Sequence, residues 1–246
     1  MNRSISIVLP AFNEAENIGA SVQHAVEILE HVGIDFEVIV VDDGSSDQTR
    51  QIADDEARGD HRIRCISHPQ NRGYGAALRT GIMASTKELI FFTDADLQFD
   101  LAEIVKLLRY ADDYDIIAGY RAERSDSLPR LANAWAWGQL IDLLFDLRVR
   151  DIDCAFKVFH RRVFDAVPIT SVGAFVNSEI LIRARAAGFR LKQLPVGHYP
   201  RPAGSPTGAN VRVIAKAFLE LGRLYGDLRG LPAPRTSPTM SSPTRS

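Results

Sequence analysis

The chain has 246 residues, 46% hydrophobic and 24% charged, an ordinary composition for a globular protein. Its net charge of −2 provides no basic field to attract nucleic acid, so we expect no nucleic-acid partner. The two cysteines, Cys65 and Cys154, are too few for a disulfide framework, and no Cys/His spacing suggests a zinc site. These features favour one large domain or two small ones in a reducing cytoplasm.

The first half of the chain alternates between strand and helix patterns. The apolar stretch near the N-terminus is too short for a signal peptide and predicts a strand at 4–9. Further strands are predicted at 35–41, 62–67, 88–93 and 114–119, and helices at 14–31, 47–58, 74–85 and 100–111. This alternation, with short connections, predicts a mostly parallel sheet covered by helices on both faces.

The second half is less regular. Helices are predicted at 129–147, 175–187 and 210–229, strands at 155–159 and 190–197, and a Pro- and Gly-rich loop at 198–208. Residues 231–246 are almost devoid of apolar side chains, which predicts a disordered tail. No run of 18 apolar residues occurs, so we expect no membrane span.

Two of these helices carry apolar stripes that suit either a lipid interface or the protein core. For the helix at 210–229 core packing is the favoured interpretation, and for the helix at 129–147 both remain open. The stripes consist of Trp135, Trp137, Leu140, Leu144 and Phe145 in the first helix and Val213, Ala217, Phe218, Leu221 and Leu224 in the second.

The strand at 88–93 leads into Asp94-Ala95-Asp96. Residues two apart in a strand point to the same face, so both carboxylates should lie side by side at its carboxyl end, where open α/β sheets bind ligands. Paired carboxylates repel unless a cation lies between them, and oxygen ligands suit Mg²⁺ or Mn²⁺ with a diphosphate on the far side. A simple strand-end turn is the alternative.

Two other loops should open onto the same crevice, because they also follow parallel strands. They are Pro10–Glu14, after the first strand, and Asp42–Asp47, after the second. Such a crevice suits a nucleotide, whose base and ribose need hydrogen-bonding carboxylates. For Asp42-Asp43 the alternative is a turn that caps the next helix, which Asp47 helps to start.

Residues Asn71–Leu78 form a glycine-rich loop that opens a helix. It is no dinucleotide fingerprint, because Leu78 occupies the third glycine position and the segment follows the third strand. Close approach to a ligand and a tight packing turn both remain open.

Together these segments resemble family 2 glycosyltransferases of the GT-A fold, in the branch of dolichyl- and polyprenyl-phosphate sugar synthases. The matching motifs are Leu9–Glu14, Val40–Thr49, Asn71–Ala77 and Asp94–Gln98, and the similarity spans about 4–229. The resemblance implies an α/β, Rossmann-like nucleotide-sugar-binding fold in a single domain at 1–230. About 1–119 would bind the nucleotide sugar and about 120–230 the acceptor.

The same resemblance implies roles for individual residues. Those expected to bind the nucleotide sugar are Pro10, Phe12, Glu14, Asp42, Asp43, Asp94 and, as a looser match, Arg130. Asp94, Asp96 and Gln98 would surround the metal, Mg²⁺ or Mn²⁺. Arg121 matches a phosphate-contacting arginine, and Arg201 lies in a loop that resembles an acceptor-phosphate loop. For each arginine the alternative is a solvated charge or an ion pair.

Two later segments resemble the branch with substitutions. Asp151–Lys157 resembles Asp-x-x-Cys-Gly-Phe-Lys, with Ala155 in place of glycine and Asp153 where a neutral residue is usual. Phe175–Glu179 resembles Phe-Asp-x-Glu, with Asn177 substituted, and a structural role is the alternative for Glu179. The histidines predicted to lie on the surface or in loops are His61, His68, His160 and His198.

The implied activity is inverting transfer of a hexose from a GDP- or UDP-sugar to a polyprenyl or dolichyl phosphate, with Asp96, Arg121, Arg201 and Asp151 as catalytic residues. We expect a cytoplasmic protein with peripheral contact to the inner face of the membrane. A hydroxyl acceptor would instead need a base such as Asp151, Asp153 or Glu179. A nucleotidyltransferase is disfavoured because the N-terminal loop is not glycine-rich, whereas a non-catalytic nucleotide-sugar-binding protein stays open. The sugar, the base and the oligomeric state are not predicted.

Overall fold

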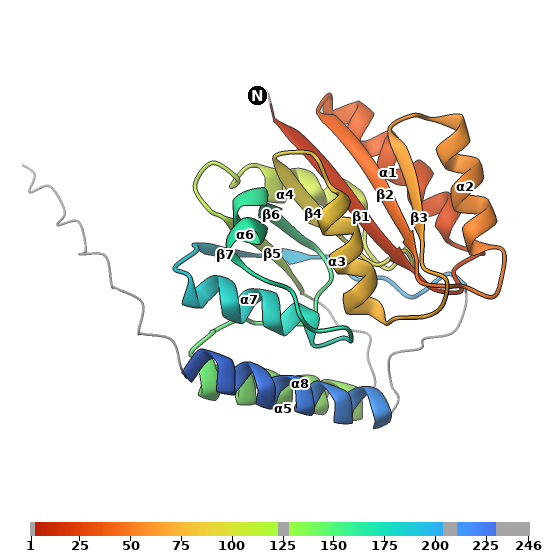
Figure 1. Ribbon diagram of the computed structural model, residues 1–246. Helices are drawn as coiled ribbons and strands as arrows, with labels where there is room; N and C mark the ends of the chain where they lie inside the picture. Colours follow the sequence, from red (N-terminus) through yellow and green to blue (C-terminus); the bar gives the residue numbers. More distant parts are fainter. Residues whose placement is uncertain (1–2, 123–127, 204–210, 230–246) are drawn as a thin grey trace, which may run out of the picture.

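The computed structural model describes residues 3–122, 128–203 and 211–229 (Figure 1). The predicted tail and most of the second half of the predicted loop at 198–208 lie outside these residues. The described chain is built on one seven-stranded sheet with the order β3-β2-β1-β4-β6-β5-β7. Its strands are β1 (Ser4–Ala11), β2 (Asp35–Asp42), β3 (Ile63–Ser67), β4 (Leu89–Phe92), β5 (Ile116–Arg121), β6 (Lys157–His160) and β7 (Leu191–Val196).

The sheet is mostly parallel, as predicted. Only β6 is reversed, because it pairs antiparallel with both β4 and β5, whereas the other four pairings are parallel. The strands β1, β2 and β4 are almost wholly buried, as expected for parallel strands covered on both faces. Helices α1 (Ile18–Val32), α2 (Thr49–Gly59) and α4 (Ile104–Leu108) share a core with one face, and a 3₁₀ turn, η1 (Leu101–Glu103), precedes α4.

The opposite face is covered by α3 (Tyr74–Ala84), α6 (Arg161–Ala166) and α7 (Val176–Ala186). Beyond α7, α5 (Leu128–Phe145) and α8 (Val211–Arg229) run side by side as an outer layer (Figure 1). Packing of α3 is close, since a Cβ at Gly81 would lie 2.3 Å from Val8 Cγ1. This contact fixes the distance between α3 and the sheet.

Two predicted helices differ from the observed ones. The helix predicted at 14–31 begins only at Ile18, because the side chains of Asp47 and Thr49 hold the preceding turn. The Thr49 hydroxyl accepts from Glu14 N at 2.8 Å, and Asp47 Oδ2 accepts from Ala15 N at 3.2 Å. The helix predicted at 100–111 is divided into η1 and the short α4, and α6 was not predicted.

The outer helices divide their apolar residues between the core and the surface. Ile141, Leu221 and Leu224 are buried, as the core interpretation predicts for the last helix. The exposed residues include Trp135 (68%), Leu143 (83%), Phe218 (51%) and Leu219 (67%). Among the described residues no helix is both long and apolar enough to cross a membrane.

Backbone packing at the start of α3 generates a stability prediction. Gly73 has φ of 101°, and a Cβ there would lie 2.3 Å from Val172 O, so Gly73→Ala should destabilise the protein by more than about 1 kcal/mol. Gly222→Ala in α8 is the matched control, because a Cβ there has nothing within 4 Å and alanine favours a helix by about 0.5–1 kcal/mol. Urea unfolding of both variants measures the contrast, and equal stabilities would contradict it.

Candidate active site

The predicted site loops meet at one edge of the sheet. Strands β1, β2, β4, β5 and β7 all run in the same direction, so the segments that follow them emerge together. This edge carries the turns after β1 and β2, the Asp94–Gln98 segment after β4, Arg121 at the end of β5 and the loop after β7.

Asp94 and Asp96 form the acidic centre of this edge. Burial and the neighbouring Asp96 charge raise the pKa of Asp94 to about 7. Burial also raises the pKa of Asp96, and the Glu14 charge adds to that effect. Asp96 Oδ1 accepts from Gln98 N at 3.1 Å, and the intervening Leu97 has φ of 57°. The turn thus holds two carboxylates where their mutual repulsion is poorly screened by water.

Two buried cations offset this negative charge. Both Lys157 and Arg121 lower the pKa of Asp94 against the effects of burial. Lys157 has an exposed fraction of 0%, and its Nζ donates to Cys154 O and, at 3.2 Å, to Ile152 O. Burial lowers the pKa of Lys157 itself. The sequence analysis assigned Lys157 to the family-like segment Asp151–Lys157 but did not predict it as a site residue.

Arg121 is held in a fork by Asp151. Its Nε donates to Asp151 Oδ2 at 2.6 Å and its Nη2 to Oδ1 at 2.8 Å, and only 8% and 7% of the two side chains are exposed. The ion pair anticipated as the alternative for Arg121 therefore exists, in a geometry that fixes the guanidinium plane. Both oxygens of Asp151 already accept guanidinium hydrogens, which leaves Asp151 better suited to orienting Arg121 than to acting as a general base.

Arg201 joins the loop after β7 to the loop after β1. Its guanidinium pairs with Glu14, and its Nε donates to Ala203 O at 2.8 Å. Burial alone would lower the pKa of Arg201, but Glu14 and the site carboxylates raise it. A second link pairs Gln98 with Tyr199, since Gln98 Nε2 donates to Tyr199 O at 3.1 Å and Tyr199 N donates to Gln98 O at 2.8 Å.

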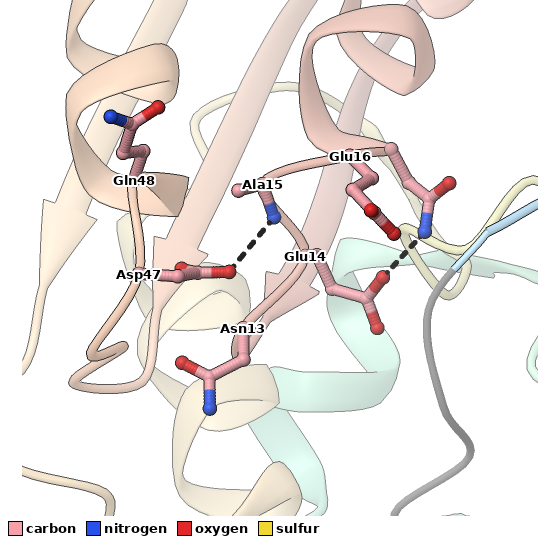
Figure 2. A pocket seen from close by; sticks show the side chains of 7 residues that line it. Asn13, Glu14, Ala15, Glu16, Asp47 and Gln48 are labelled. Carbon is pink, nitrogen blue, oxygen red and sulfur yellow. Dashed lines mark hydrogen bonds between the residues drawn. The ribbon is translucent and has the colours of Figure 1, made fainter.

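The end of β1 supplies the rest of the predicted nucleotide pocket. Pro10 is buried and Phe12 is half-buried. Glu14 also accepts from Asn17 Nδ2 at 2.8 Å, and it borders an open hollow of about 380 Å³ between the turns after β1 and β2 (Figure 2). The lining residues are Asn13, Glu14, Ala15, Glu16, Asn17, Asp47 and Gln48.

Asp42 and Asp43 are both buried and both make turn contacts. Asp42 Oδ1 accepts from Ser45 N at 3.1 Å. Asp43 accepts from Arg72 N at 2.9 Å and Gly73 N at 2.7 Å, and lies 2.6 Å from His68 Nδ1. Asp43 thereby anchors the glycine-rich loop, which favours the packing interpretation of that loop.

His68 lies in the loop after β3, as the prediction of a surface or loop position allows, but it is buried, with an exposed fraction of 7%, and its Nε2 lies 3.0 Å from Thr80 Oγ1. The same prediction was wrong for His160, which ends β6 with 12% of its side chain exposed. Glu179 has the structural role given as its alternative. It is 1% exposed, accepts from Thr170 N at 3.0 Å and Ser171 N at 2.8 Å, and pairs with Arg183 at 3.0 Å. The Arg130 side chain lies outside the described residues.

The residues present fit a hard divalent cation. Within the described ranges no cluster of three or more His, Cys, Asp or Glu residues could hold a metal. Asp94 and Asp96, with the amide oxygen of Gln98, nevertheless offer the oxygen ligands that Mg²⁺ or Mn²⁺ prefers, with a diphosphate and water completing the shell. The raised pKa values of both carboxylates show that the site favours added positive charge.

The fold is that of GT-A glycosyltransferases. Glucosyl-3-phosphoglycerate synthase from Mycobacterium tuberculosis, in complex with Mg²⁺ and UDP, superposes with a TM-score of 0.67 at 24% identity, covering 89% of this chain and 80% of that one. Mannosyl-3-phosphoglycerate synthase from Rubrobacter xylanophilus has a TM-score of 0.70 at 19% identity, covering 93% and 75%. The predicted fold class is confirmed.

Residues 6–168 match the model of Glycosyl transferase family 2, and the chain belongs to this family. Glycosyltransferase AglD from Haloferax volcanii is 36% identical over 208 residues, which are 80% of this chain and 33% of the relative. Undecaprenyl-phosphate 4-deoxy-4-formamido-L-arabinose transferase from Enterobacter sp. (strain 638) is 29% identical over 216 residues, 85% of this chain and 64% of the relative. The chain thus spans a third to about two thirds of these proteins.

The Asp94–Asp96 pair predicts a specific pH dependence of stability. Asp94 has a pKa of about 7 in the folded protein, against 3.8 for an unperturbed group. The folded state therefore binds this proton more tightly, and the contribution of Asp94 to stability is lost as the pH rises from about 4 to about 7.

Asp94→Asn should therefore be more stable than the wild type in metal-free buffer, by a margin that grows over this interval. Saturating Mn²⁺ should narrow the margin at pH 7.5. Melting temperatures of both proteins across the pH range test this, and a margin independent of pH would refute the charge-repulsion account.

Proposed function

We propose that the chain is an inverting glycosyltransferase that moves a hexose from a GDP- or UDP-sugar to a polyprenyl or dolichyl phosphate. One observation carries the proposal: a carboxylate pair, the half-buried Asp94 and the buried Asp96, lies at the end of a strand together with two arginines from the other half of the chain. Carboxylates that need a cation suit the donor diphosphate, and oriented guanidinium groups suit a second phosphate.

The two halves of a single domain would divide the substrates between them. About 1–119 would bind the nucleotide sugar, with Asp42 and Asp43 toward base and ribose. The pocket walls would come from Pro10, Phe12 and Glu14, with Arg130 as a further contact to the nucleotide sugar. About 120–230 would receive the acceptor.

In the proposed reaction an oxygen of the acceptor phosphate attacks the anomeric carbon, and the nucleoside diphosphate leaves from the opposite side. This single displacement inverts the anomeric centre. Held by Asp94, Asp96 and Gln98, Mg²⁺ or Mn²⁺ would supply electrostatic stabilisation of the departing diphosphate. Arg121 and Arg201 would align the phosphate groups, a positioning contribution.

A phosphate acceptor fits these contacts better than a hydroxyl. A phosphate oxygen is already ionised at pH 7, so no general base is required. Of the three acids predicted as bases, Asp151 is occupied by Arg121, and Glu179 by Thr170, Ser171 and Arg183, whereas Asp153 is exposed to solvent. The name of the Enterobacter relative, an undecaprenyl-phosphate transferase, also supports a lipid phosphate.

The proposal places the protein in peripheral contact with the cytoplasmic face of the membrane, and exposed apolar side chains on the outer helices support contact with a membrane surface. Trp135 and Leu143 on α5 and Leu219 on α8 expose 68%, 83% and 67% of their surfaces. Exposed tryptophan and leucine on such helices suit the boundary between headgroups and acyl chains.

The acceptor prediction separates lipid phosphate from hydroxyl. Transfer to detergent-solubilised polyprenyl phosphate should release UDP or GDP from one member of a panel of nucleotide sugars, whereas the dephosphorylated alcohol should give none. Arg201→Ala should lower turnover at least about tenfold, the scale of one lost charge-assisted contact, and Arg201→Lys should recover only part of it.

Arg58→Ala serves as the matched control, because Arg58 lies on α2 with its side chain 74% exposed. Equal transfer to the alcohol and the phosphate would exclude the lipid-phosphate acceptor. Release of neither nucleotide from any donor would favour a non-catalytic binding protein.

The two aspartates after β2 should respond differently to substitution. Asp42→Ala should weaken binding of the donor nucleotide about tenfold, since a charge-assisted hydrogen bond contributes about 1.5–3 kcal/mol. Asp43→Ala should in addition lower the melting temperature, because it leaves two backbone N–H groups and His68 without their acceptor. Calorimetric titration with UDP and GDP, together with thermal unfolding, measures both effects. If both variants bind the nucleotides normally, Asp42 and Asp43 have only the alternative role, that of forming the turn that caps the next helix.

A further inference from the structure

Tyr74, the first residue of α3, places its hydroxyl beside the acidic centre. Its ring packs against the core cluster that contains Phe175 and Val176, and its Oη is buried. The neighbours of Oη are the Asp94 carboxylate and the Asn177 side chain. Both Tyr74 Oη and Asn177 Oδ1 are buried, and among the described residues neither atom has a partner at hydrogen-bonding distance and angle. The three polar groups are thus neighbours poised to form a network.

The backbone around Tyr74 is fixed by close packing rather than by its own side chain. A Cβ at Gly73 would lie 2.3 Å from Val172 O, and a Cβ at Gly75 would lie 2.6 Å from Ser171 O. In addition, Gly75 N donates to Val172 O at 3.0 Å. Glu179 in turn holds Ser171 N at 2.8 Å. Tyr74 therefore has a defined position relative to α7, which also carries Asn177.

The chemistry of the three groups sets the direction of the contacts. A phenol has an ordinary pKa of about 10, so the Tyr74 hydroxyl is protonated at neutral pH and can donate only one hydrogen. The Asp94 carboxylate is the acceptor that gains most from it, and the Asn177 amide can donate to Oη from the other side. Carboxylates that bind metals are commonly oriented by such a second layer of hydrogen bonds.

We propose that Tyr74 is a positioning residue for the divalent cation: its hydroxyl donates to Asp94 and fixes the carboxylate for metal binding, while Asn177 orients that hydroxyl. This inference rests on the proposed function, because it requires a cation at Asp94 and Asp96. The contact is expected to shorten when ligands bind, as hydrogen bonds in active sites often do.

Tyr74→Phe tests the inference, because it removes only the hydroxyl. Mn²⁺ binding in the presence of UDP, or of GDP if the protein selects it, is measured by electron paramagnetic resonance of free Mn²⁺. The variant should bind Mn²⁺ about 10- to 100-fold more weakly, the usual effect of losing an orienting partner. Its metal-free affinity for the nucleotide and its melting temperature should stay close to those of the wild type.

Tyr110→Phe is the matched control, since Tyr110 on the opposite side of the sheet is partly buried against the other core cluster. Asn177→Ala should weaken Mn²⁺ binding less than Tyr74→Phe. The variant that carries both substitutions should bind Mn²⁺ as tightly as Tyr74→Phe alone, because Asn177 acts through the Tyr74 hydroxyl.

Mn²⁺ affinity within twofold of the wild type in Tyr74→Phe would overturn the inference, as would additive losses in the double variant. If Tyr74→Phe does not fold, Asn177→Ala decides alone, and an unchanged Mn²⁺ affinity in that variant rejects the network. Failure of the wild type to bind Mn²⁺ with either nucleotide would count against the proposed function instead.

Discussion

The structure depends on the repulsion between two carboxylates at the end of one buried strand. Asp94 and Asp96 follow β4 directly, and burial penalises both as charged groups. Cations from other elements partly neutralise the two carboxylates: Lys157 from β6, Arg121 from β5 and Arg201 from the loop after β7. A bound divalent cation would complete this balance, in keeping with the proposed metal site.

The single reversed strand explains how one of these cations reaches the centre. Because β6 runs antiparallel to β4 and β5, its first residue lies at the edge where those strands end. That residue is Lys157, which is paired in register with Phe92, two positions before Asp94. A parallel strand would place its last residue there and its lysine at the far edge. The departure from a fully parallel sheet is thus tied to the electrostatics of the site.

Much of the fold and part of the site were predictable from the sequence. The apolar strands and the loops that follow them are local patterns, and parallel pairing then brings Asp42, Asp94 and Arg121 to one edge. Contacts between distant segments were not predictable, because spacing along the chain carries no information about them. His68 was predictable as a loop residue, but its burial was not, because only the fold brings Asp43 and Thr80 to either side of it. The position of Tyr74 near Asp94 was likewise not predictable, because it depends on the packing of Gly73 and Gly75 on the segment before α7.

Hydrogen bonds and an ion pair join the proposed donor and acceptor sides of the edge. Arg201 pairs with Glu14, and Tyr199 exchanges hydrogen bonds with Gln98, so the loop after β7 is attached both to the expected base pocket and to the expected metal turn. A ligand that draws either Glu14 or Gln98 into new contacts must therefore also change the restraints on Arg201. If the proposed roles hold, this arrangement would link occupation of the donor side to the freedom of the arginine proposed to bind the acceptor phosphate, without any need for a separate moving domain.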